Sequence, residues 1–139
     1  MLKLCGNAFL VNRQRNSNKM EEIKNRRKDT MTTNEKIAQI RELMKRDHVQ
    51  AAVIPSGDPH MSEYFSEHWK TRRFVSGFTG SVGTYVITEN ASGLWVDGRY
   101  YVQAEKQIAD SEATLFRASE PDCPTFTQYL HDTLPENST

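Results

Sequence analysis

The chain has 139 residues with 37% hydrophobic content, and its 18 basic side chains balance its 18 acidic ones. A neutral chain has no field that would gather nucleic acid or an anionic membrane, so neither is expected as a partner. No apolar run approaches the ~20 residues that a membrane-spanning helix needs. The two cysteines, Cys5 and Cys123, favour free thiols in an intracellular protein. We therefore expect a cytoplasmic protein with one folded domain.

The first segment, residues 1–31, differs in composition from the rest. Its first 30 residues carry eight Lys or Arg side chains against three Asp or Glu, and residues 11–28 are mostly Asn, Arg, Lys, Gln and Glu. Such a segment buries too little apolar surface to offset the entropy lost on ordering. We expect a disordered or tag-like basic arm over residues 1–31 and the folded domain over residues 32–139. A basic targeting arm is the alternative, and its acidic residues argue against it.

Regular structure is expected after the arm. Apolar residues recur at helical spacing and predict a helix over 33–48. The short apolar run 51–54 predicts a buried strand. Asp58 followed by Pro59 is typical of a helix start and predicts a short helix through about Ser66.

The remaining elements alternate β-like runs with turns, and they complete the predicted fold. A turn at 89–93 should join two of the strands as a hairpin. The order predicts an α/β domain with a mixed, partly antiparallel sheet flanked by helices. The predicted elements are strands at 74–76, 84–88, 94–96 and 114–116, a helix capped by Asp97, and a helix over 124–134.

Gly77, Gly80 and Gly83 lie in one short segment, which raises the question of a phosphate-binding loop. Such a loop follows a strand and opens a helix, whose N-terminus holds the phosphate. Here the β-branched run 84–88 follows instead, and the Lys-Ser/Thr pair of a P-loop is absent. The segment is therefore interpreted as a tight connection, where glycine allows positive φ or close backbone approach.

The sequence offers no pattern for a metal centre or a catalytic nucleophile. A zinc site needs His and Cys clustered at fixed spacing, and the serines lie outside a Gly-x-Ser-x-Gly elbow. The histidines are scattered, at His48, His60, His68 and His131.

Two arginine-containing segments remain to be explained. Arg99 lies in the first turn of the helix capped by Asp97, where the helix dipole disfavours a cation by ~0.3–1 kcal/mol. It should therefore have a carboxylate partner, and both an internal Asp or Glu and a ligand group outside the domain remain open. Arg72 and Arg73 are interpreted as a solvated edge or an interface pair, because two cations in a neutral chain do not make a nucleic-acid patch.

Several blocks, at matching spacing, resemble a known family. From about Asn34 to Leu134 the chain resembles the N-terminal domain of Xaa-Pro aminopeptidase (aminopeptidase P), which has the creatinase/prolidase type of fold. The blocks are Ile54-Pro55-Ser56-Gly57-Asp58, His60-Met61-Ser62-Glu63-Tyr64, Arg72-Arg73-Phe74-Val75-Ser76-Gly77-Phe78-Thr79-Gly80-Ser81, Gly83-Thr84, Leu94-Trp95-Val96-Asp97-Gly98-Arg99-Tyr100 and Gln103-Ala104.

The resemblance implies a parent metallopeptidase that removes an N-terminal residue preceding proline. In that family two Asp, one His and two Glu hold two Mn²⁺ ions in a C-terminal domain to which nothing in these residues corresponds. The chain alone is therefore expected to be inactive and without a metal or cofactor. Its expected role is to help shape the substrate site and subunit contacts, with a homodimer and a monomer both open. A non-enzymatic interaction module, or a pseudoenzyme domain of the same fold, is the alternative.

The resemblance to this family implies a substrate-binding role for one residue of this chain. The arginine of the Asp-Gly-Arg-Tyr block contacts the peptide substrate there, and its position here is Arg99. Asp97, Tyr100 and Tyr64 lie in the matching blocks and are further candidates for substrate binding. No catalytic residue and no metal ligand is expected in this chain.

Overall fold

The computed structural model describes residues 31–60, 62 and 64–139. Residues Thr33–Thr139 form a unit of their own, and the fold described here is that of this unit. The expected basic arm lies, apart from its last residue, outside the described residues.

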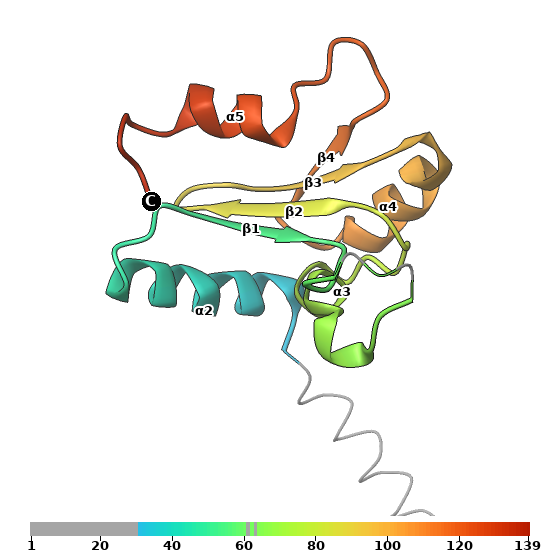
Figure 1. The fold of residues 1–139 in the computed structure, drawn as a ribbon, viewed down its shortest axis with the longest axis horizontal. Helices are drawn as coiled ribbons and strands as arrows, with labels where there is room; N and C mark the ends of the chain where they lie inside the picture. Colours follow the sequence, from blue (N-terminus) through green and yellow to red (C-terminus); the bar gives the residue numbers. More distant parts are fainter. Residues whose placement is uncertain (1–30, 61, 63) are drawn as a thin grey trace, which may run out of the picture. The chain divides into compact units, whose positions relative to one another are not determined.

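A four-stranded mixed sheet forms the centre of the unit (Figure 1). Its strand order is β1-β2-β3-β4, with antiparallel β1–β2 and β2–β3 pairs and a parallel β3–β4 pair. The expected hairpin is present, and its turn is closed by a 2.8 Å hydrogen bond from the Thr88 N–H to the Ala91 carbonyl. The predicted mixed sheet with antiparallel neighbours is confirmed. The strands are β1 (Ala51–Pro55), β2 (Thr84–Thr88), β3 (Ser92–Val96) and β4 (Thr114–Arg117).

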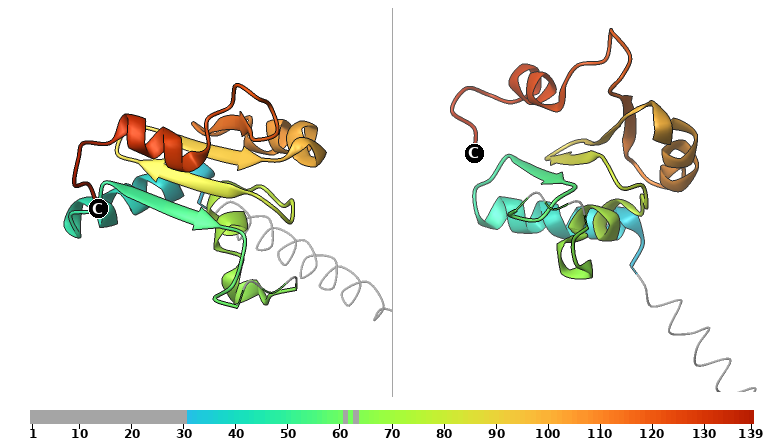
Figure 2. Two further views of the ribbon diagram at one scale, coloured as in Figure 1. Left: turned by 45° about the horizontal axis from the view of Figure 1, so that its top comes forward. Right: turned by 45° about the vertical axis from the view of Figure 1, so that its right-hand side comes forward.

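Helices α2 (Thr33–Arg46) and α5 (Phe126–Thr133) lie on opposite sides of the sheet (Figures 1 and 2). Helix α4 (Tyr101–Ile108) shares the α2 side, because residues of both helices enter one buried cluster. Burying one apolar stripe of each helix against the sheet is the usual way such layers are stabilised. The buried cluster is Ile37, Met44, Val75, Phe78, Tyr85, Ile87, Leu94, Val96, Ala104 and Ile108.

The other face of the sheet carries an aromatic stack that holds α5. Trp95 and Phe116 stack with ring centroids 3.9 Å apart and an interplanar angle of 2°. Tyr129 of α5 packs against both rings, at 5.3 and 5.4 Å. The Trp95 indole N–H donates a 2.8 Å hydrogen bond to the Pro124 carbonyl just before α5. Thr125 caps the helix by accepting from the Gln128 N–H, so α5 begins slightly later than predicted.

The expected strand over 74–76 is wrong, because these residues end an α-helix, α3 (Thr71–Ser76). Its buried residues are Arg72, Val75 and Ser76, which is the i, i+3, i+4 spacing of a helical face. Gly77 ends the helix with φ 74° and donates its N–H to the Arg73 carbonyl. This left-handed cap favours glycine. Packing of the helical face thus overrides the strand preference of the run.

The short helix expected to begin after Asp58 is also wrong. The Asp58 carboxylate accepts hydrogen bonds from the backbone N–H groups of His60, at 3.1 Å, and Ser62, at 2.9 Å. In a helix the Ser62 N–H would donate to the backbone carbonyl of Asp58 instead. The side chain thus competes with the helix for a backbone donor. Among the described residues after Asp58, the first helical turn is a 3₁₀ turn, η1 (Glu67–Trp69).

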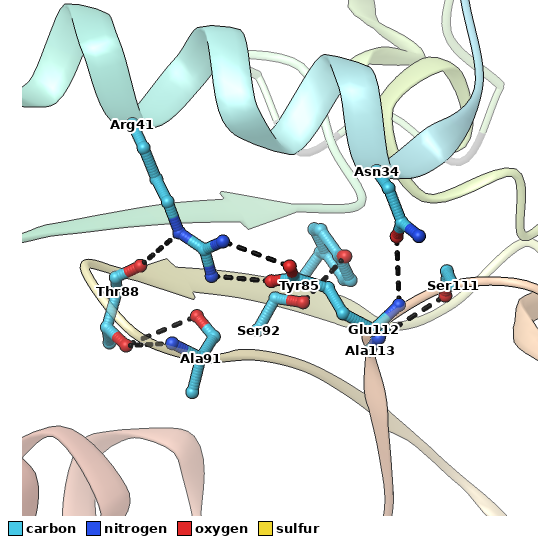
Figure 3. A network of polar contacts seen from close by, with 9 residues as sticks. All are labelled: Asn34, Arg41, Tyr85, Thr88, Ala91, Ser92, Ser111, Glu112 and Ala113. Carbon is cyan, nitrogen blue, oxygen red and sulfur yellow. Dashed lines mark hydrogen bonds and ion pairs between the residues drawn. The ribbon is translucent and has the colours of Figure 1, made fainter.

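A polar network ties α2 to the sheet (Figure 3). Arg41 donates from Nε to the Thr88 carbonyl, at 2.9 Å, and forms a two-pronged ion pair with Glu112. The Glu112 N–H donates in turn to the side chain of Asn34. One arginine thereby links the end of β2 to the segment before β4.

Candidate functional site

The predicted substrate residue Arg99 lies just beyond the C-terminal end of β3. The chain leaves the sheet there and enters a 3₁₀ turn, η2 (Gly98–Tyr100), which leads into α4. Asp97 caps the turn as predicted, because its Oδ1 accepts a 3.0 Å hydrogen bond from the Arg99 N–H. The Asp-Gly-Arg-Tyr part of the family-like block is thus a solvent-accessible corner between a strand and a helix.

The Arg99 guanidinium donates hydrogen bonds to Asp97, the residue that caps the turn. Its Nε donates to Asp97 Oδ1 at 3.0 Å, and a terminal nitrogen donates to Oδ2 at 2.8 Å. These hydrogen bonds lower the pKa of Asp97 and raise that of Arg99. Of the two partners that the sequence left open, the internal carboxylate is therefore present.

The Arg99–Asp97 pair is accessible to solvent. The Arg99 side chain is 69% exposed and the Asp97 side chain 30% exposed. Exposed ion pairs of this kind contribute only about 0–1 kcal/mol. A second carboxylate or a carbonyl could therefore exchange with Asp97 at small cost.

Tyr64 lies at a different place, in the wall of a pocket of about 280 Å³. The pocket lies between the end of β1, the α3 region and the glycine segment, and Arg99 is not among its lining residues. Its lining residues are Pro55, Ser56, Tyr64, Phe65, Trp69, Lys70, Arg72, Arg73, Thr79, Gly80 and Ser81.

Tyr100 connects the two places. Its hydroxyl lies 2.6 Å from the Ser81 Oγ, and Ser81 lines the pocket. The four candidates from the sequence therefore do not form one cluster. Asp97 and Arg99 form a pair, Tyr100 contacts the pocket wall through Ser81, and Tyr64 lines the pocket.

Arg72 is the residue whose role the sequence interpretation missed. It is 5% exposed, so the expectation of a solvated edge is wrong for it. Its Nε donates a 2.6 Å hydrogen bond to Ser56 Oγ, and its terminal nitrogens donate to the carbonyls of Phe78 and Gly80. Burial lowers the pKa of Arg72 to about 10. The buried face of α3 was the available signal, but the prediction of a strand there hid it.

The glycine segment lets the backbone carbonyls of Phe78 and Gly80 come close to the Arg72 guanidinium. A Cβ on Gly80 would lie 2.3 Å from the Phe78 ring, so a side chain there would displace the ring or the carbonyl that receives Arg72. The interpretation of this segment as a tight connection with close backbone approach is confirmed.

The described residues contain no group of three or more His, Cys, Asp or Glu that could hold a metal ion. The residues present therefore do not fit the two-metal site that the resemblance implies elsewhere in such an enzyme. Within the same described residues, no helix is long and apolar enough to cross a bilayer.

Two known proteins that resemble the chain are named Xaa-Pro aminopeptidases. It is 48% identical over 105 residues to a probable Xaa-Pro aminopeptidase P of Coprinopsis cinerea, and 44% identical over 113 residues to Xaa-Pro aminopeptidase ApepP of Drosophila melanogaster. These matches cover 76% and 77% of the chain but only 17% and 18% of the relatives. The chain thus spans less than a fifth of the length of these relatives.

Solved structures and a family profile agree with this similarity. An X-prolyl aminopeptidase of Caenorhabditis elegans, described as a cytosolic enzyme with a di-nuclear active site, superposes with a TM-score of 0.72 at 33% identity, over 78% of this chain and 19% of that one. An X-Pro aminopeptidase of Thermotoga maritima has a TM-score of 0.52 at 22% identity over 69% of this chain and 24% of its own, which supports the fold alone. The profile of the Creatinase/Prolidase N-terminal domain matches residues 36–139. The chain therefore belongs to the creatinase/prolidase N-terminal domain family.

Proposed function

We propose that residues 36–139 act as the N-terminal domain of a metal-dependent Xaa-Pro aminopeptidase, an enzyme that removes an N-terminal residue preceding proline. The observation that carries this proposal is the 48% identity over 105 residues and the 44% identity over 113 residues to proteins of that name. The names of these relatives do not favour the non-enzymatic alternative. In this proposal the domain shapes the substrate site and contributes no catalytic group.

Arg99 is the residue by which the domain touches the substrate. Its exposed guanidinium is held by a carboxylate that can share it, so a peptide carbonyl or carboxylate can compete for the outer N–H groups. Asp97 fixes the direction of the side chain, and Tyr100 and Tyr64 are the further candidates for substrate contact. A substrate group can take the place of Asp97 on the guanidinium, so this role is compatible with the internal ion pair.

The metal site belongs to the same proposal. Two Mn²⁺ ions, held by residues outside this chain, would supply an activated water for attack on the peptide bond. The relative from Caenorhabditis elegans is described as having a di-nuclear site, which supports a two-metal enzyme. That relative is also described as cytosolic, which supports a cytoplasmic location.

A domain exchange tests the proposal. Residues 36–139 replace the corresponding domain of the Caenorhabditis elegans aminopeptidase, and cleavage of an Arg-Pro-Pro peptide is measured with Mn²⁺. The chimera is expected to release arginine, and the 139-residue chain alone is expected to release none.

Two results would contradict the proposal. One is metal-dependent cleavage by the isolated chain above the level of a mock purification. The other is a chimera that folds, as judged by circular dichroism, and binds metal but does not cleave the peptide.

A further inference from the structure

The pocket beside α3 is strongly asymmetric in charge. Its lining includes Lys70, Arg72 and Arg73, and no Asp or Glu is among its lining residues in the described part of the chain. A cleft lined by one sign of charge attracts ligands of the opposite sign. The overall neutrality of the chain hides this local excess.

The three cations are only partly compensated by nearby acids. Lys70 forms an ion pair with Glu67, which lies outside the lining. Lys70, and to a smaller extent Arg73, lower the pKa of Glu67. Among the described residues, neither Arg72 nor Arg73 forms an ion pair with a carboxylate. Of the residues that the structure describes, one acid therefore faces three cations.

The burial of Arg72 makes this excess of positive charge unfavourable for the folded domain. Arg72 is almost fully buried, its hydrogen-bond partners are a hydroxyl and two carbonyl oxygens, and its guanidinium lies 4.8 Å from the centroid of the Phe78 ring. Burying a cation without an anion carries a desolvation penalty, which neutral acceptors offset only in part. An anion entering the pocket would reduce that penalty, so the fold itself favours an anionic occupant.

Aromatic side chains form the rest of the wall. Tyr64 is 89% exposed and Trp69 41% exposed, and Phe65 lies between them in the sequence. Exposed aromatic groups beside cations suit a ligand that joins an apolar group to a carboxylate. An inorganic anion would leave these rings without a partner.

We propose that this pocket binds a glutamate side chain of an acidic protein segment, together with the aromatic or aliphatic residue next to it. Arg73 and Lys70 pair with the carboxylate at the mouth, Arg72 lies beneath them as a fixed charge, and Trp69 and Tyr64 pack on the apolar neighbour. Asp97 and Arg99 are not among the residues that line this site, and binding there does not depend on peptidase activity.

Isothermal titration of the 139-residue chain with short peptides tests this proposal. The probes are acetyl-Glu-Phe-amide, its neutral counterpart acetyl-Gln-Phe-amide, and acetyl-Gly-Phe with a free terminal carboxylate. The glutamate peptide is expected to bind at least tenfold tighter than the glutamine peptide, and more weakly as salt is raised. Arg73→Gln is expected to lower the affinity for the glutamate peptide about tenfold, because it removes a charge-assisted hydrogen bond.

The matched control is Arg46→Gln, which removes an exposed arginine at the end of α2, outside the pocket lining. It is expected to leave the affinity unchanged. Equal binding of the glutamate and glutamine peptides would overturn the proposal, as would an unchanged affinity in Arg73→Gln. Tighter binding of the peptide with the free terminal carboxylate would overturn the assignment to a glutamate side chain. Both exposed arginines can be replaced without touching the core, so a folding defect does not confuse the result.

Discussion

Gly93 is the second residue of β3 and lies directly beneath the aromatic stack. A Cβ at this position would lie 2.6 Å from Phe116 Cε2 and 2.8 Å from Trp95 Cζ3. Contacts this short do not persist, so a methyl group must displace a ring. The two rings are themselves stacked at 3.9 Å, and Tyr129 of α5 packs against both. We therefore expect Gly93→Ala to disturb the attachment of α5.

The magnitude follows from two opposing effects. Replacing glycine by alanine reduces the entropy of the unfolded chain and stabilises by ~0.4–1 kcal/mol where the fold accepts a Cβ. Overpacking a well-filled interior costs ~1–3 kcal/mol. Because the rings have little room to move, overpacking should win. The net effect is a loss of about 1–2 kcal/mol in the free energy of unfolding, or roughly 4–16 °C in Tm for a domain of this size.

Urea denaturation followed by circular dichroism measures this difference. The matched control is Gly98→Ala, because the Cβ there meets only Tyr101, at 3.9 Å. The control is expected to be neutral or slightly stabilising. An unfolding free energy of Gly93→Ala equal to or above that of the unmodified chain would refute the packing described for this face of the sheet.

Three further predictions concern polar groups. Arg41→Met removes the link to Glu112 and leaves the Thr88 carbonyl without its donor, so the free energy of unfolding should fall by about 1–2 kcal/mol in urea titrations; no change would mean that the network contributes nothing. Arg72→Met leaves two inward carbonyls unsatisfied and should lower Tm by at least ~8 °C in thermal melts, whereas a rise would show that the buried charge is a net burden. The pKa of Asp58 is lowered, chiefly by the hydrogen bond from the Ser62 N–H, so its contribution is complete above the unfolded pKa near ~3.9 and is lost as pH falls through the lower folded value. Urea midpoints from pH 6 to 2.5 should therefore fall less steeply in Asp58→Asn than in the unmodified chain, and parallel curves would contradict this.

Local signals were enough to predict much of the sheet. The hairpin of β2 and β3 follows from two β-branched or aromatic runs separated by a turn. The α2 helix follows from apolar residues at helical spacing, and the Asp97 cap from its position before α4. In each of these cases the sequence preference and the packing agree, so short-range reasoning succeeds.

Contacts between distant segments account for what the sequence did not predict. The run Phe74-Val75-Ser76 has strand-like residues, yet Arg72 three positions before Val75 shares its buried face, and only the tertiary core shows this. The stack of Trp95, Phe116 and Tyr129 joins β3, β4 and α5, and no spacing in the sequence predicts it. The expected carboxylate partner of Arg99 is present, but Arg99 lies in a 3₁₀ turn before α4 and not in the first turn of the α-helix. The sequence pattern did not show that Asp97 is this partner.

The most direct test of the account is the effect of Arg99→Ala on kcat/KM in the chimera described above. Loss of one charge-assisted hydrogen bond to the substrate, ~1.5–3 kcal/mol, predicts a fall of about 10- to 150-fold. The matched control is Arg46→Ala, because Arg46 also forms a two-pronged pair with a neighbouring carboxylate and is 68% exposed. Arg99→Ala is expected to lower kcat/KM at least tenfold and Arg46→Ala to leave it unchanged, and equal values for the two variants would contradict the role of Arg99.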